Sequence, residues 1–277
     1  MTSLLRPMVL ACLLLHLSFL SISQNETIVK YYDSTWQEVP GKSAHYISRF
    51  KSRDDIYICN TYWAASQKLY SIAAKLQATH YAKTIGLSLG FHENGRTRDS
   101  TYYDANGSVE ISYHYFDDGK VQDSIFYGEE QKVDSAWHYH KNGSLKVRYI
   151  FDKKTKQETT NAFDETGQVI KNYVYYIRSE FPGGALGWRV FLQNNLDPLT
   201  PINKKAPDGT YQVIARFIIL KDGTLSDLKT ETTFGFGMEQ EVLRVLRKSP
   251  RWSPEVFLNE KVTSLRRQPV TFVVSGR

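Results

Sequence analysis

Cysteine, proline and long apolar runs are scarce in this sequence, and each scarcity narrows what the chain can be. The 277 residues include only two cysteines, Cys12 and Cys59, so no disulfide framework is expected to support the fold. The nine prolines form no rich run, which argues against a proline-rich spacer. The longest apolar run covers residues 8–20. It is shorter than the roughly 20 residues of a membrane-spanning helix.

Recognised catalytic and metal-binding motifs are missing as well. The sequence has no glycine-rich phosphate loop, no Gly-x-Ser-x-Gly, no His-Glu-x-x-His and no nucleic-acid-binding motif. His138 and His140 would share one face of a strand and offer a weak metal site at most, and packed or solvated repeat histidines explain them more simply. We therefore expect a protein that is not an enzyme, with no catalytic residue, no metal and no cofactor.

The first 23 residues have the organisation of a secretory signal peptide. Arg6 precedes the apolar run, and Ser21 and Ser23 supply the small residues of a cleavage site. Removal of this segment would leave Cys59 as the single cysteine, which we expect to be a small buried side chain. The sequence thus predicts an exported chain; the alternative is that residues 1–23 stay uncleaved and anchor it.

A repeat of 12 residues runs through residues 89–170. Four residues after each aromatic position comes a turn position, often Asn-Gly or Asp-Gly, which is the strongest short signal for a hairpin. Turn glycines spaced by 24 residues are all kept, whereas the alternate series keeps only Gly107. This alternation predicts a meandering antiparallel sheet built from hairpins. The aromatic positions are Phe91, Tyr103, Tyr115, Tyr127, Tyr139, Phe151 and Phe163.

The array resembles the MORN-type repeat arrays of bacterial exported proteins. We assign residues 25–178 to this all-β hairpin-repeat region, with the period clearest over residues 89–170. Strands are expected in residues 25–88, although residues 64–76 fit a helix or a strand equally well. Residues 173–177 are predicted to form its last strand.

A different pattern begins at residues 181–184, where Phe-Pro-Gly-Gly ends the repeat. A short helix is predicted over residues 185–196. Residues 211–220 are apolar on both faces, which indicates a central strand, and Asp222-Gly223 marks the hairpin turn that follows. Residues 197–209 are expected to be a loop. The buried side of the short helix is predicted to be Leu186, Val190, Phe191 and Leu196.

A second helix is predicted to begin near Met238 and to end before Pro250. Its apolar residues fall on one face, which we expect to be buried, whereas Glu239 and Glu241 should turn mostly away. Trp252 is expected to pack the end of this helix against the sheet. The apolar face consists of Met238, Val242, Val245 and Leu246.

These features together resemble the TonB C-terminal domain. The resemblance covers residues 181–277. It rests on four stretches: the Phe-Pro-Gly-Gly entry, Lys-Asp-Gly at 221–223, Arg-Lys-Ser-Pro-Arg-Trp-Ser-Pro at 247–254, and Gln-Pro-Val-Thr-Phe at 268–272. It implies an α+β domain with the element order α-β-β-α-β, placed after the all-β antiparallel repeat sheet.

The resemblance also implies a function, because TonB domains bind an extended segment of outer-membrane receptors, the TonB box, by strand addition. The expected partner is an outer-membrane receptor or another envelope protein. A role linked to energy transduction and transport across the outer membrane is a further option, which requires the first segment to stay uncleaved. The chain would lie in the periplasm or envelope, or on the periplasmic side of the inner membrane if it stays anchored. The candidate binding edge is Leu265, Arg266, Arg267, Gln268, Val270, Thr271 and Phe272.

Two further interpretations stay open, one of the charge and one of the function. Residues 181–277 hold 14 Lys and Arg against 9 Asp and Glu, which favours either an acidic partner or simply a solvated basic face. Arg266 and Arg267 are expected to steer such a partner. The alternative function is a structural or scaffolding protein in which the MORN-like repeat sheet is the interaction surface.

Overall fold

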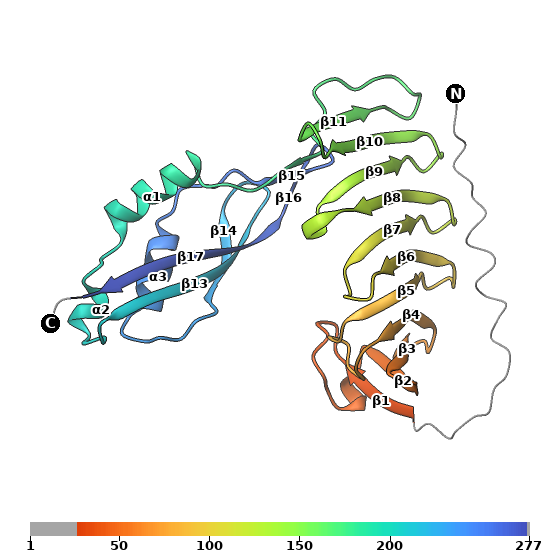
Figure 1. Ribbon diagram of the computed structural model, residues 1–277, viewed down its shortest axis with the longest axis horizontal. Coiled ribbons are helices and arrows are strands. Elements are labelled where there is room, and N and C mark those ends of the chain that lie inside the picture. The colour runs from red at the N-terminus through yellow and green to blue at the C-terminus, as the bar shows by residue number, and fades with distance from the viewer. Residues whose placement is uncertain (1–26, 276–277) are drawn as a thin grey trace. The chain divides into compact units, whose positions relative to one another are not determined.

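The computed structural model describes residues 27–275, so the predicted signal peptide at 1–23 lies outside the described residues. Eleven antiparallel strands follow one another in the sheet in the order in which they occur in the chain (Figure 1). The described residues form two compact units, one through Gly143 and one from Ser144 onward. The strands are β1 Thr27–Tyr32, β2 Tyr46–Arg53, β3 Ile56–Trp63, β4 Leu69–Lys75, β5 Thr84–Phe91, β6 Thr97–Tyr103, β7 Val109–Tyr115, β8 Val121–Tyr127, β9 Val133–Tyr139, β10 Leu145–Asp152 and β11 Gln157–Ala162.

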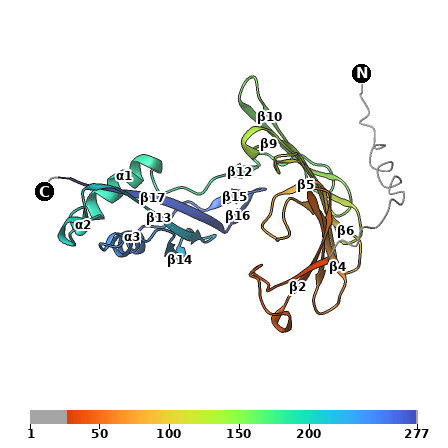
Figure 2. The same ribbon diagram turned by 60° about the horizontal axis from the view of Figure 1, so that its bottom comes forward.

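The strands of the first unit build a curved sheet (Figure 2). The predicted 12-residue period is confirmed, because strands β5 to β9 each end on one of the repeated aromatics. In the turn after β5, the Gly95 N–H donates to the His92 carbonyl and the His92 N–H donates to the Arg96 carbonyl. Gly95 has a φ of 84°, so the loop is a tight turn closed by a left-handed residue, the place where glycine has no steric penalty.

Most turns on the alternate edge of the sheet reverse the chain without a glycine. Gln131 and Lys156 have φ values of 58° and take the left-handed conformation themselves. A short 3₁₀ helix, η2 Glu129–Gln131, widens one of these turns. The predicted looser edge is therefore present, and non-glycine residues there adopt the strained left-handed conformation.

Residues 27–91 continue the same meander with five strands, β1 to β5. The ambiguous stretch 64–76 contains strand β4, so the strand interpretation is the correct one. A ring stack and a 3₁₀ helix, η1 Gly41–Ser43, lie in this part of the unit. The Trp36 ring is stacked between Tyr46, at 4.1 Å between centroids, and His80, at 3.8 Å. Burial, followed by the nearby Lys75 charge, lowers the pKa of His80 to about 4.

The second unit contains a three-stranded sheet ordered β14-β13-β17, together with three helices (Figure 1). The predicted order of strand, turn, strand, helix and strand is present, but two short strands at 255–257 and 260–262 lie between the helix and the last strand. The central strand is β13, as its two apolar faces indicated. The elements are α1 Gly184–Asn195, α2 Thr200–Asn203, β13 Gly209–Ile219, β14 Leu225–Thr230, α3 Met238–Arg247 and β17 Ser264–Val274.

The core of this sheet lies on one face of β13. The fully buried residues Val213, Ala215, Phe217 and Ile219 meet Met238, Val242 and Leu246 of α3. Trp252 belongs to the same cluster and donates its Nε1–H to Ser249 Oγ at 2.8 Å, which confirms its predicted packing role. Burying these apolar side chains supplies most of the driving force for the fold, at roughly 25 cal/mol per Å².

Four expectations about this unit are wrong in detail. Leu186 and Val190 of α1 are 68% and 46% exposed, because Trp188 and Leu192 turn toward the core instead. The stretch 197–209 contains helix α2. The expected last repeat strand is reduced to β12 Tyr176–Ile177, which pairs with β15 Glu255–Phe257; β15 in turn pairs with β16 Glu260–Val262.

The fourth concerns the two glutamates of α3, which were expected to turn away but are buried. The Glu239 carboxylate accepts the N–H groups of Phe234 and Gly235, at 2.7 and 3.2 Å. It therefore satisfies backbone donors just before the helix, where a negative charge is also favoured by the macrodipole.

Candidate functional site: the outer strand of the small sheet

Strand β17 forms one edge of the three-stranded sheet. Its Cα partners on β13 run antiparallel without interruption from Ser264 opposite Ile219 to Val274 opposite Gly209. Within residues 27–275, no strand pairs with its other side. All seven residues of the candidate binding edge therefore lie on an edge strand.

The side chains of β17 divide between the two faces of the sheet. Val270, Phe272 and Val274 are buried in the core cluster. On the other face, Leu265 and Val273 are 57% and 66% exposed. An edge strand that is anchored on one face and exposed on the other presents a fixed row of backbone groups to an incoming strand.

Pro269 indicates which backbone groups face outward. Proline lacks an N–H, so it is tolerated in a paired strand where that N–H would point away from the neighbouring strand. Alternate residues of an antiparallel strand direct their N–H groups to the same side. We therefore expect the N–H groups of Leu265, Arg267, Thr271 and Val273 to point toward the open side of β17.

The turn between β13 and β14 fixes the sheet to the end of α3. Gly223 has a φ of 86°, and its carbonyl accepts the Trp252 N–H at 2.9 Å. A Cβ on Gly223 would lie 2.1 Å from the Trp252 carbonyl oxygen. The Asp222-Gly223 turn predicted from the sequence is thus also the point where the chain after α3 packs closely on the sheet.

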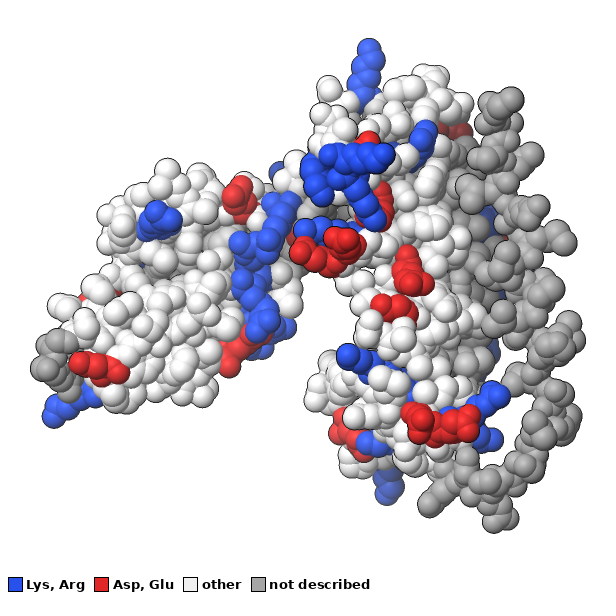
Figure 3. Space-filling view, viewed as in Figure 1, with Lys and Arg blue, Asp and Glu red and all other residues white. Residues whose placement is uncertain are grey.

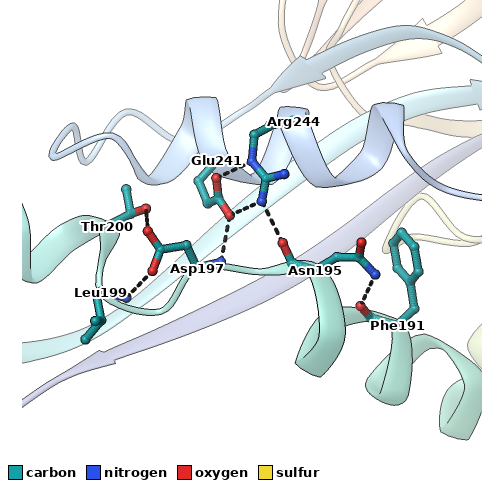
Figure 4. A network of polar contacts seen from close by, with 7 residues as sticks. All are labelled: Phe191, Asn195, Asp197, Leu199, Thr200, Glu241 and Arg244. Carbon is teal, nitrogen blue, oxygen red and sulfur yellow. Dashed lines mark hydrogen bonds and ion pairs between the residues drawn. The ribbon is translucent and has the colours of Figure 1, made fainter.

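A partly buried ion pair holds the three helices together (Figure 4). The Glu241 carboxylate accepts the Asp197 N–H at 2.7 Å and the Arg244 Nε–H at 2.7 Å. Arg244 also donates to the Asn195 carbonyl at 2.6 Å, at the end of α1. The hydrogen bond from Arg244 lowers the pKa of Glu241, which therefore stays ionised at neutral pH. Asp197 accepts the N–H of Leu199 and the hydroxyl of Thr200, which sets the start of α2.

Charged side chains cross the outer face of the sheet in register. Arg216 of β13 lies opposite both Lys229 of β14 and Arg267 of β17. Two carboxylates share these charges: Asp227 pairs with Lys229 at 2.7 Å, and Glu231 accepts the Arg267 Nε–H at 2.7 Å. Arg267 is therefore already paired, which weakens its expected steering role.

Arg266 differs from its neighbour. It lies opposite Phe217, and its guanidinium carbon is 5.8 Å from the centroid of the Trp252 ring. Its Nε is buried and has no hydrogen-bond partner among the described residues. The sequence singled out both arginines, but only the structure separates a paired surface arginine from an unpaired, half-buried one.

The histidine columns of the repeat contain no metal centre in residues 27–275, where no group of three or more His, Cys, Asp or Glu side chains could hold an ion. Instead, Asp123 lies between His114 and His138 in direct register across β7, β8 and β9. Cys59 is buried, and burial raises the pKa of its thiol, which lowers the fraction present as the reactive thiolate.

Comparisons with known proteins give little beyond this geometry. No protein-family model matches the sequence, and no curated protein matches it. Among solved structures, a mutant of S. aureus TarM in complex with fondaparinux, α-GlcNAc-glycerol and UDP matches 41% of this chain and 21% of its own, at 15% identity and a TM-score of 0.27. That similarity is too low to support an argument about fold or function. None of the helices in residues 27–275 is long and apolar enough to cross a membrane.

Proposed function

We propose that this chain is an exported envelope protein whose small sheet binds an extended peptide segment by strand addition to β17. The partner would be an outer-membrane receptor or another envelope protein. A role in energy transduction and transport across the outer membrane, as in TonB proteins, would require the first segment to stay uncleaved. The protein would act in the periplasm or envelope, or from the periplasmic side of the inner membrane if its first segment stays uncleaved. The proposal involves no catalytic residue, metal, cofactor or nucleic acid.

The observation that supports this proposal best is the position of β17. It has 11 residues, all paired with β13 on one side, and no strand pairs with its other side among the described residues. Long open edges are avoided in soluble proteins unless they are blocked or used. Residues 181–277 contain α1, β13, β14, α3 and β17 in the order expected for a TonB-like domain, with α2, β15 and β16 in addition, and this order is consistent with the same use.

A titration of the full chain with TonB-box peptides tests the proposal. Strand addition depends on main-chain hydrogen bonds, so a peptide N-methylated at alternate residues on its pairing side should lose most of its affinity. The same peptide methylated on the other side is the matched control and should bind as the parent does. Equal binding of the two methylated peptides would contradict strand addition.

The scaffolding alternative has one observation in its favour. Leu87 and Tyr102 are register partners on neighbouring strands, and they are 49% and 46% exposed. Adjacent exposed apolar side chains on a sheet favour contact with another protein. If residues 25–178 capture envelope partners while residues 181–277 do not, the repeat sheet is the interaction surface.

A further inference from the structure

Two arginines without a carboxylate partner occur at the end of the small sheet where β17 begins. Arg266 is the third residue of β17, and Arg178 directly follows β12. Within residues 27–275, neither guanidinium forms a hydrogen bond or an ion pair. The neighbouring arginine, Arg267, is by contrast bound by Glu231.

The chain around Trp252 brings these two arginines to one place. The residue after Trp252, Ser253, exchanges two backbone hydrogen bonds with Glu180, which places the segment that follows β12 beside Trp252. Arg266 lies over the ring of the same tryptophan. Figure 3 shows a band of Lys and Arg side chains across one face of the small sheet.

Buried polar atoms at this place lack partners. Arg266 Nε is buried and makes no hydrogen bond to any described residue. Ser264 lies two residues earlier on the same face of β17; it is 8% exposed, and its Oγ is likewise without a partner among residues 27–275. A buried donor left unsatisfied destabilises the folded state, so such groups in a folded protein need an explanation.

The nearby acidic group does not neutralise the pair. Burial, and then the positive charge of Arg178, lower the pKa of Arg266, while Glu180 and Tyr176 act in the opposite sense. The Glu180 carboxylate is directed elsewhere, since its Oε1 is 2.8 Å from where a Cβ of Gly184 would be, at the start of α1. The site therefore retains an excess of positive charge.

We infer that Arg178 and Arg266 form a carboxylate-binding site that takes an acidic side chain of the segment bound at β17. The site itself follows from the two arginines and the unpartnered atoms; only the source of the carboxylate rests on the proposed function. Guanidinium groups bind carboxylates through directed, charge-assisted hydrogen bonds, and the Arg266 Nε–H has no acceptor among the described residues.

The register of the sheet gives the spacing of the partner's residues. Val270 lies four residues after Arg266 on the same face of β17, and Phe272 follows two residues later. An added strand with an Asp or Glu beside Arg266 would therefore place apolar residues four and six positions away on that face. Its opposite face would meet the exposed Leu265 and Val273.

The test uses the full chain and two pairs of probes. The first pair is N-acetyl-glutamate amide and its glutamine analogue, which carry one side chain and no strand. The second pair is an eight-residue peptide of alternating Thr and Val with a single Glu, and the same peptide with Gln in that place. Binding is followed by the NMR resonance of the Arg266 Nε–H and by the backbone amides of β17.

We expect only the glutamate amide to shift the Arg266 Nε–H. The Glu peptide should bind at least about tenfold more tightly than the Gln peptide, which is about 1.4 kcal/mol and the lower end of what one hydrogen bond to a charged group contributes. Arg178→Gln, an exposed residue whose loss should not disturb folding, and Arg266→Gln should both abolish this preference. Arg251→Gln, a change at an arginine with a 72% exposed side chain, is the matched control and should keep it.

The outcomes separate this inference from the proposed function. If both peptides shift the β17 amides with equal affinity and the glutamate amide leaves the Arg266 Nε–H unmoved, strand addition stands and the carboxylate site is overturned. If the glutamate amide shifts that resonance but no peptide affects β17, the site stands and strand addition fails. Loss of the preference in Arg251→Gln to the same extent would also overturn the site.

Discussion

His114 Nδ1 lies 2.6 Å from Asp123 Oδ1, and the two residues are Cα partners on β7 and β8. The hydrogen bond to Asp123 raises the pKa of His114. On the other side of Asp123, His138 Nδ1 is 3.9 Å from Oδ2. Asp99 lies opposite His114 on β6 and also favours its charge, whereas Arg98 opposes it. The repeat sheet thus contains an alternating row of acids and imidazoles.

This row predicts a pH dependence of stability. The pKa of His114 is higher in the folded chain than its usual value of about 6.5. The stabilisation of the fold by protonated His114 is therefore fully present below about pH 6.5, the pKa of the unfolded chain. The contribution is lost as the pH rises through the raised pKa. We expect the free energy of unfolding of the first unit, measured with urea, to be lower at about pH 8.5 than at about pH 6.

Asp123→Asn should remove most of this difference, because the amide cannot hold the imidazolium charge. Asp117→Asn, at an exposed turn of the same sheet, is the control and should keep it. A pH profile that is unchanged in Asp123→Asn would rule out the interpretation.

Two glycines with similar backbone angles should respond differently to alanine. Gly223 and Gly119 have φ values of 86° and 89°, but a Cβ meets the Trp252 carbonyl only at Gly223; at Gly119 nothing lies within 4 Å. We expect Gly119→Ala to destabilise its unit by about 1–2 kcal/mol, and Gly223→Ala to cost roughly 2–5 kcal/mol because overpacking is added. Hydrogen exchange of residues 211–230 measures the second effect locally. Equal losses of stability in the two variants would show that the Trp252 backbone moves to accommodate the added methyl group.

The ion pair between Glu241 and Arg244 should be important for the stability of the second unit. Glu241→Ala leaves the Asp197 N–H and Arg244 without their acceptor, so we expect a loss of about 2–3 kcal/mol. Gln240→Ala changes an exposed neighbour on the same helix and should be nearly neutral. Urea unfolding of the two variants side by side measures the difference, and a neutral Glu241→Ala would contradict the network in Figure 4.

The sequence predicts the repeat sheet well because its signals are local. Asn-Gly and Asp-Gly turns, with Gly95 as the example, close each hairpin within a few residues of the strands they join. Central strand β13 and the apolar face of α3 are predicted for the same reason, since both follow from periodicity alone.

Other features depend on contacts between distant parts of the chain. The helical pattern predicts that Glu241 faces solvent. In the structure its carboxylate instead accepts the N–H of Asp197, which lies 44 residues earlier. Arg178 meets the start of β17 only because β12 pairs with β15 rather than with the repeat sheet. No periodic signal in the sequence encodes such pairings, so the carboxylate site is not visible before the fold is known.

Removing one outward N–H from β17 should weaken strand addition without unfolding the sheet. Thr271 is exposed, and its N–H is expected to face the open side, as that of residue 269 would if it were not proline. Thr271→Pro should therefore lower peptide affinity about fivefold, the equivalent of one hydrogen bond of about 1 kcal/mol. Thr271→Val keeps the N–H and should bind normally. Calorimetric titration of both variants with one TonB-box peptide measures the difference.

The central claim is that the outer side of β17 accepts a foreign strand. Its most direct test is the set of backbone amide shifts when the full chain is titrated with TonB-box peptides. We predict the largest shifts at Leu265, Arg267, Thr271 and Val273, with alternate residues moving less and β14 unchanged. Amide shifts confined to the repeat strands, or a β17 that stays unperturbed at saturating peptide, would contradict the account.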